Sequence, residues 1–139
     1  MGTAISFTDP TISAALADSL DFLWIDTEHA MMSMEAVRGH VLAGQAHNTP
    51  VLVRVPGSGM QWIKPALDSG ADGIIVPQIY SAQEAREVVR DCRYPPLGAA
   101  RLWPTRALQF WAHQPNRGDE SGQQRGVCLG ADRDGGGAG

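Results

Sequence analysis

The first 93 residues alternate between short apolar runs and longer segments whose apolar residues recur at helical spacing. The apolar runs are rich in β-branched side chains and lack strict alternation, a pattern typical of strands buried on both faces. They predict strands at residues 3–7, 21–26, 50–56 and 73–79. Strands of this kind favour a parallel sheet that is covered by helices.

Each predicted strand is followed by a segment with the signals of a helix. Asp9 and Pro10 suit a helix start, Ser33 is a candidate N-cap, and Gly70 is a stop signal. The predicted helices are residues 9–19, 33–46, 59–70 and 81–93. Four consecutive β-α units predict an α/β domain.

Two architectures fit these units: an open doubly wound sheet, or part of an eight-stranded (β/α)8 barrel. A complete barrel needs about 200 to 250 residues, so a chain of 139 residues could supply about half of one. Residues 99–139 are rich in proline, glycine and arginine, with one possible helix near 105–112 and a final "GADRDGGGAG". We therefore expect the domain to occupy residues 1–98 and an irregular, poorly ordered tail to occupy residues 99–139.

The composition excludes several classes of partner. It is 43% hydrophobic and 19% charged, which is ordinary for a soluble globular domain, and fifteen acidic residues oppose eleven basic ones without a basic cluster. Nucleic acid is therefore an unexpected partner. No apolar run approaches the roughly 20 residues of a membrane span, and no leader pattern opens the sequence, so we expect a cytoplasmic protein. Cys92 and Cys128 lack metal-type spacing and predict two reduced thiols.

The stretch "FLWIDTEHAMM" places polar chemistry at the end of a predicted strand. Its apolar run stops at Asp26, and Glu28 and His29 follow. Ligands bind at the carboxyl ends of parallel strands, and Arg54 stands near the end of the next predicted strand. Since adjacent strands are about 4.8 Å apart, the guanidinium of Arg54 could reach the same pocket as the imidazole of His29.

These residue types suit proton abstraction or carbon–carbon cleavage next to a carbonyl. Histidine exchanges protons near neutral pH, and a neighbouring carboxylate can fix its tautomer. Arginine can hold a substrate carboxylate or a developing enolate oxygen. The alternative is a solvated loop that caps the next helix. Arg54 lies in an apolar strand and needs an anionic partner, either Asp26, Glu28 or a ligand.

Other polar residues contribute less to this hypothesis. His40 and His47 stand seven residues apart on a predicted helix and are expected at the surface. Lys64, the single lysine, lies on a helix between strands, so an imine mechanism is disfavoured.

The chain resembles the HpcH/HpaI aldolases of 2-oxo acids. The matching signals cover about residues 2–98 in order: "DFLWIDTEHA", "PVLVRVP", "IKPALDSGADGIIVPQI" and "SAQEAREVVRDCRYPPLGA". The resemblance implies that residues 1–98 form about the first four β-α units of a TIM barrel. It implies a lyase that cleaves 2-oxo acids reversibly to pyruvate and an aldehyde, and that assembles as homo-oligomers.

The resemblance also implies a cofactor and roles for four residues. A divalent metal (Mg2+, Mn2+ or Co2+) chelates pyruvate through its carboxylate and keto oxygen and stabilises the enolate. His29 is then the catalytic acid/base and Asp26 its orienting partner. Arg54 binds the substrate and steadies the enolate and keto oxygens, and Glu28 supports the motif. A related enolate reaction, such as decarboxylation of oxaloacetate, would use the same residues.

The sequence departs from the family in its second part. The family's metal ligands, a glutamate in a strand reading Gln-Ile-Glu-Thr and an aspartate on the following strand, do not appear here. The glycine-rich turn after "YPPLGA" is replaced by Arg101 to Pro104. We therefore expect weak or no activity, or a non-catalytic remnant or interaction fragment, and no homo-oligomer contacts from the missing elements.

A shift of reading frame would explain this departure. GTG CAG ATC GAG ACG GCG GAG GC encodes Val-Gln-Ile-Glu-Thr-Ala-Glu, and one added G changes the reading to Gly-Ala-Asp-Arg-Asp-Gly-Gly-Gly. The second string is residues 130–137 as they stand. We therefore hypothesise a frameshift, genuine or from sequencing, directly after Leu129, which the coding DNA tests.

Overall fold

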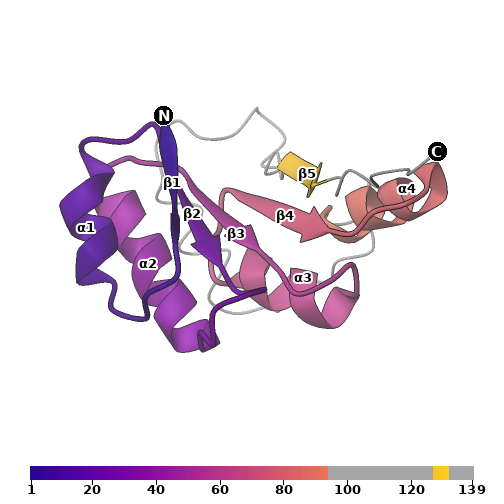
Figure 1. Ribbon diagram of the computed structural model, residues 1–139, viewed down its shortest axis with the longest axis horizontal. Coiled ribbons are helices and arrows are strands. Elements are labelled where there is room, and N and C mark those ends of the chain that lie inside the picture. The colour runs from indigo at the N-terminus through magenta and orange to yellow at the C-terminus, as the bar shows by residue number, and fades with distance from the viewer. Residues whose placement is uncertain (94–126, 132–139) are drawn as a thin grey trace, which may run out of the picture.

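The computed structural model describes residues 1–93 and the strand at residues 127–131. Strands and helices alternate along the chain (Figure 1). The strands are β1 (Gly2–Ile5), β2 (Phe22–Asp26), β3 (Val51–Arg54), β4 (Gly73–Pro77) and β5 (Val127–Ala131). The helices are α1 (Thr11–Ala17), α2 (Met34–Ala46), α3 (Met60–Asp68) and α4 (Ala82–Asp91). Each element predicted within residues 1–93 is present, with ends that differ by a few residues.

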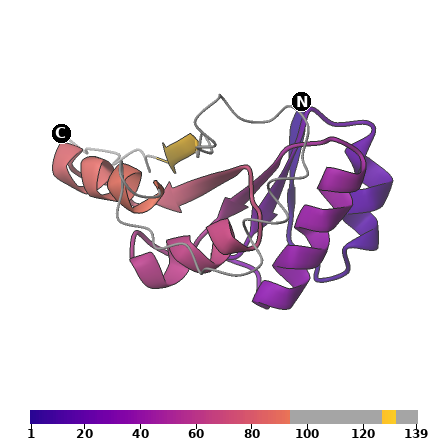
Figure 2. The same ribbon diagram turned by 180° about the vertical axis from the view of Figure 1, so that it is seen from behind.

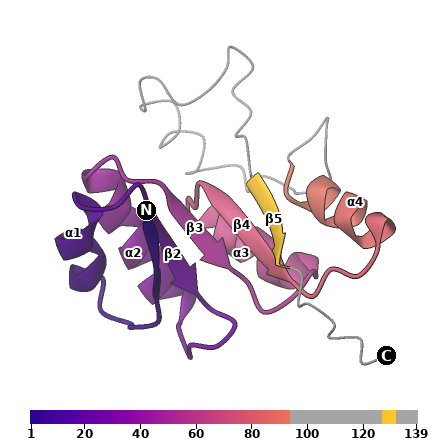
Figure 3. The same cartoon turned by 45° about the horizontal axis from the view of Figure 1, so that its top comes forward.

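The five strands form one parallel sheet in the order β1-β2-β3-β4-β5. Because each strand lies beside the next one in the chain, right-handed crossovers place the helices on one face. Figure 3 shows α2 and α3 behind the strands, and Figure 2 shows α1 and α2 side by side on that face. A doubly wound sheet reverses its strand order. The order found here is that of consecutive units of a (β/α)8 barrel.

The hydrophobic core lies between the helices and the sheet. In β2 and β3 every second side chain faces this core: Leu23, Ile25, Val51 and Val53 are fully buried. The strand register pairs Leu23 with Val51 and Ile25 with Val53, so the two strands bury the same face. The alternate residues therefore project from the opposite face. Asp26 and Arg54, which end these strands, belong to that second set.

Helix ends follow the local signals in the sequence. The hydroxyl of Ser33 accepts the N–H of Ala36 at 3.2 Å and caps α2 as predicted. The carboxylate of Asp9 accepts the N–H of Thr11 at 2.9 Å at the start of α1. Gly70, after α3, has a φ of 96°, a left-handed conformation that favours glycine.

One expectation about a segment was wrong. Residues 127–131 were expected to be irregular, and they form β5, which pairs in parallel with β4. This strand depends on a partner more than 50 residues earlier in the chain rather than on local propensity. The predicted boundary at residue 98 and the possible helix near 105–112 lie outside the described residues.

None of the helices in the described part of the chain has the length and the apolar character needed to span a membrane.

His40 was expected at the surface and is instead fully buried. Position 40 lies three residues after Val37 and four before Gly44, so all three share the buried face of α2. The expectation followed from the polar side chain of histidine, whereas the helical spacing from Val37 and Gly44 indicates that position 40 is buried. His47 is partly exposed, and its Nδ1 lies 2.8 Å from a carboxylate oxygen of Asp18.

Candidate functional site

Asp26 and Arg54 face each other at the carboxyl ends of β2 and β3. They are direct partners in the strand register. Nε of Arg54 donates to Oδ1 of Asp26 at 3.1 Å, and Nη2 donates to Oδ2. The side chains are 7% and 17% exposed respectively. The anionic partner that the sequence required for Arg54 is therefore present in the chain itself.

The loop after β2 folds around the carboxylate of Asp26. Oδ1 accepts the backbone N–H of Glu28 at 3.0 Å and that of His29 at 3.2 Å. Thr27 binds across to β3: its N–H and its hydroxyl both donate to the carbonyl oxygen of Arg54, at 2.9 and 2.6 Å. An aspartate that accepts N–H groups two and three residues later stabilises a tight turn. The loop geometry is thus encoded in "DTEH" itself.

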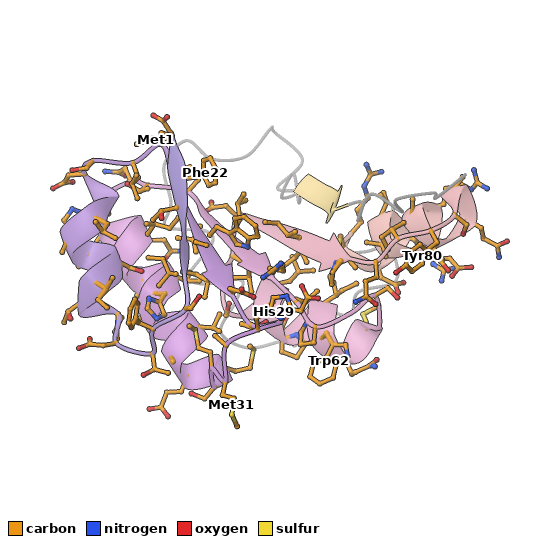
Figure 4. The ribbon with its side chains drawn as sticks, viewed as in Figure 1. Met1, Phe22, His29, Met31, Trp62 and Tyr80 are labelled. Carbon is orange, nitrogen blue, oxygen red and sulfur yellow. The ribbon has the colours of Figure 1, made fainter. Side chains whose placement is uncertain are left out.

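Glu28 connects the guanidinium to the imidazole. Its Oε2 lies 3.2 Å from Nη1 of Arg54 and 3.7 Å from Nε2 of His29. The carboxylate is 14% exposed and the imidazole 58% exposed. Figure 4 shows His29 beyond the carboxyl end of β2, at the opposite edge from Phe22. The structure therefore brings His29, Glu28 and Arg54 together, as the sequence predicted for these residues.

Asp26 and Arg54 each stabilise the charged form of the other. Burial raises the pKa of Asp26, but hydrogen bonds from Arg54 and from the N–H groups of His29 and Glu28 outweigh burial, and the net pKa is lowered. The hydrogen bond to Asp26 raises the pKa of Arg54, despite the opposing effect of its burial. Near neutral pH the site therefore contains a carboxylate and a guanidinium that are both fully charged.

The structure places Asp26 differently from the expected orienting partner of His29. Its carboxylate contacts the backbone N–H of His29 and the side chain of Arg54. The imidazole of His29 lies instead 3.7 Å from a carboxylate oxygen of Glu28. Asp26 thus positions His29 through the loop backbone, and Glu28 contacts its ring.

Sequence reasoning missed Trp24. The guanidinium carbon of Arg54 lies 5.1 Å from the centroid of the Trp24 ring. Trp24 stands two residues before Asp26 on the same strand, so both side chains project from the same face. That spacing is a signal that the sequence offers, although an apolar residue in an apolar run does not stand out.

The described residues do not fit a complete metal site. Within residues 1–93, no group of three or more His, Cys, Asp or Glu side chains is arranged to hold a metal ion. The two carboxylates of the site, Asp26 and Glu28, both contact Arg54. A guanidinium within salt-bridge distance of both carboxylates competes with a cation for the same oxygens.

A family model for HpcH/HpaI aldolase/citrate lyase matches residues 6–126. The chain belongs to this family. The HpcH/HpaI chain is 43% identical over 102 residues to a hydroxypyruvate/pyruvate aldolase of Roseovarius nubinhibens, covering 70% of this chain and 38% of that protein. It is 34% identical over 98 residues to a 4-hydroxy-2-oxo-heptane-1,7-dioate aldolase of Escherichia coli, covering 70% and 36%.

A solved structure gives the same result for the fold. The HpcH/HpaI aldolase from Desulfitobacterium hafniense superposes with a TM-score of 0.69 at 33% identity, covering 73% of this chain and 40% of that one. The chain therefore spans about two fifths of the length of these relatives. Residues 6–126, which the family model matches, contain the strands and the loop that carry the candidate site.

Proposed function

We propose that this chain carries the acid/base and anion-binding part of a metal-dependent 2-oxo acid aldolase, a lyase that releases pyruvate and an aldehyde. The observation that supports it best is the bridge formed by Glu28, which lies between the imidazole of His29 and the guanidinium of Arg54. The names of the similar proteins, hydroxypyruvate/pyruvate aldolase among them, support the substrate class.

Arg54 is proposed to bind the substrate carboxylate or enolate oxygen. A guanidinium has five N–H donors, and two of them go to Asp26. Nη1 lies beside Glu28. The remaining N–H groups of Nη1 and Nη2 are available to a ligand. Because Asp26 keeps the guanidinium charged and fixed, these donors are oriented before a substrate arrives.

His29 is proposed to move the proton. In cleavage, a base takes the proton of the substrate hydroxyl, the adjacent carbon–carbon bond breaks, and its electron pair forms the enolate of pyruvate. The imidazole of His29 is exposed enough to reach a bound substrate, and its backbone is fixed by Asp26. Glu28, 3.7 Å from Nε2, would stabilise the imidazolium that results.

A divalent metal, Mg2+, Mn2+ or Co2+, belongs to the proposal through the resemblance to the family. Its ligands are not provided by the described residues, so none of the steps above uses the metal. The reading-frame hypothesis suggests where a ligand would come from. In the restored frame the glutamate of Gln-Ile-Glu would follow the last residue of β5, Ala131, by two positions.

The proposal is tested by aldol turnover. Pyruvate release from a 4-hydroxy-2-oxo acid should be very low for the chain as it stands with Mn2+ or Co2+, and should rise in a chain with the downstream frame restored. In the restored chain, His29→Ala and Arg54→Ala should each lower kcat/KM about 100-fold or more, whereas His47→Ala on the far end of α2 should not. Unchanged rates would remove His29 and Arg54 from the site.

The same assay distinguishes the alternatives. Turnover of oxaloacetate to pyruvate without aldol cleavage would indicate the related decarboxylase. Absence of every activity in both chains would indicate a non-catalytic interaction fragment. The proposal also includes a cytoplasmic location and homo-oligomers for the restored chain, which cell fractionation and sedimentation test.

A further inference from the structure

Arg54 contacts an aromatic ring as well as two carboxylates. Nε and Nη2 face Asp26, and the guanidinium carbon lies 5.1 Å from the centroid of the Trp24 ring. Trp24 and Asp26 lie two residues apart on β2 and project from the same face of the sheet. One edge of the Arg54 guanidinium is therefore hydrogen-bonded to a carboxylate, and the guanidinium carbon lies over an indole ring.

The two contacts constrain different movements. A carboxylate that accepts from Nε and Nη2 sets the direction of one edge of the guanidinium, but the plane can still tilt about that edge. Guanidinium groups stack on aromatic rings through cation–π attraction. A ring beneath Arg54 opposes the tilt, so it fixes where the outer N–H groups point.

The ring face of Trp24 is the part of its side chain that Arg54 contacts. The property that tryptophan adds is its π face, which attracts cations more strongly than those of tyrosine or phenylalanine.

We infer that Trp24 is a positioning residue: its ring fixes the plane of the Arg54 guanidinium so that the N–H groups left free by Asp26 point toward a substrate oxyanion. The inference rests on the proposed function of Arg54. It adds a role to a residue that itself need not touch the substrate.

The test follows the Nε–H group of Arg54 by NMR in the full chain without substrate, so it does not depend on catalysis. Arg54→Lys removes the signal and thereby assigns it. We expect the Hδ resonances of Arg54 to lie upfield of random-coil positions because of the indole ring current, since these protons, unlike Hε, form no hydrogen bond to Asp26. Trp24→Leu should abolish this displacement and make Nε–H exchange with water about fivefold faster.

Two matched variants separate a ring effect from general packing. Trp24→Phe keeps a ring and should keep most of the displacement and slow exchange. Trp62→Leu removes a half-exposed indole at the start of α3 and should leave the Arg54 signals unchanged. Equal exchange rates in the unaltered chain and in Trp24→Leu would overturn the inference.

The unaltered chain provides a test that no folding defect can obscure. Random-coil positions for the Hδ resonances of Arg54 would overturn the inference even if Trp24→Leu does not fold. Failure of the proposed function would look different: the restored chain would show no aldol turnover, while the Arg54 signals would still carry the ring-current displacement.

Discussion

Ser13 and His40 form a buried hydrogen bond of 2.7 Å between α1 and α2. Nε2 of His40 lies 2.9 Å from the carbonyl oxygen of Phe7, and a carbonyl can only accept, so Nε2 carries the proton and Nδ1 accepts from the Ser13 hydroxyl. Neither Ser13 nor His40 is exposed. A neutral imidazole therefore connects the two helices to the loop that follows β1.

This arrangement predicts that acid destabilises the fold through His40. Burial lowers the pKa of His40 below its ordinary 6.5, and the Phe7 carbonyl and Asp9 offset this only in part. The unfolded chain therefore takes up a proton first, and the free energy of unfolding falls as pH drops below 6.5. The contribution reaches about 1.4 kcal/mol per pH unit until the pH passes the folded pKa. Urea unfolding at a series of pH values measures it.

Variants assign the pH effect to one histidine. His40→Gln should remove the slope contributed by this group, although the variant will be less stable at neutral pH. His47→Gln should retain the slope, because that imidazole lies at the surface beside Asp18. An unchanged slope in His40→Gln would show that another group is responsible.

Ser13→Ala should destabilise the protein by about 1–3 kcal/mol. The substitution leaves Nδ1 of His40 buried without its donor. Ser19→Ala changes an exposed serine after α1 and should have an effect within about 0.5 kcal/mol. Chemical denaturation of both variants gives the comparison, and equal effects would contradict a structural role for the buried hydrogen bond.

Asp26→Asn should destabilise the fold by about 3 kcal/mol, because it leaves Arg54 partly buried without its main counter-charge. The double variant with Arg54→Met should be less destabilised than the sum of the single variants. Lys64→Met, which breaks a surface pair with Asp68, should cost less than about 1 kcal/mol. Additive effects of the Asp26 and Arg54 substitutions would rule out coupling.

The ion pair of Asp26 and Arg54 predicts a second loss of stability at acid pH, below that caused by His40. Since the folded pKa of Asp26 is lowered from its ordinary 3.8, its contribution to stability is present above that value. This contribution of Asp26 to stability is lost as the pH falls from 3.8 through the lower pKa that Asp26 has in the folded protein. Asp26→Asn should therefore flatten the acid limb of the unfolding curve, and an acid limb of unchanged steepness would contradict this.

Gly44→Ala should destabilise the contact between α2 and β3 by about 1–3 kcal/mol. An added Cβ would lie 2.3 Å from Cγ2 of Val51 and 2.9 Å from the carbonyl oxygen of Thr49. Gly39→Ala in the same helix meets the Pro10 ring at 3.1 Å and gains helix propensity, so it should be close to neutral. Thermal unfolding of the two variants tests the difference.

The sequence predicted the β-α alternation because apolar runs, N-caps and Gly70 are local signals. It also placed Asp26, Glu28, His29 and Arg54 at one sheet edge, since parallel strands share their carboxyl ends. The apolar pattern alone left a barrel and a doubly wound sheet open, because strand order is a long-range property. The resemblance to the family pointed to the barrel, which the strand order confirms. Sequence reasoning missed β5 because that strand depends on pairing with the distant β4. It missed the ring of Trp24 beneath Arg54 because an apolar residue in an apolar run does not stand out.

The central claim is that His29 and Arg54 act on one ligand. An NMR titration of the chain with the downstream frame restored, with pyruvate in the presence of Mg2+, follows the imidazole Hε1 of His29 and the Nε–H of Arg54 at the same time. We predict that both resonances shift and yield one dissociation constant. Movement of one resonance without the other, or two different constants, would contradict a shared site.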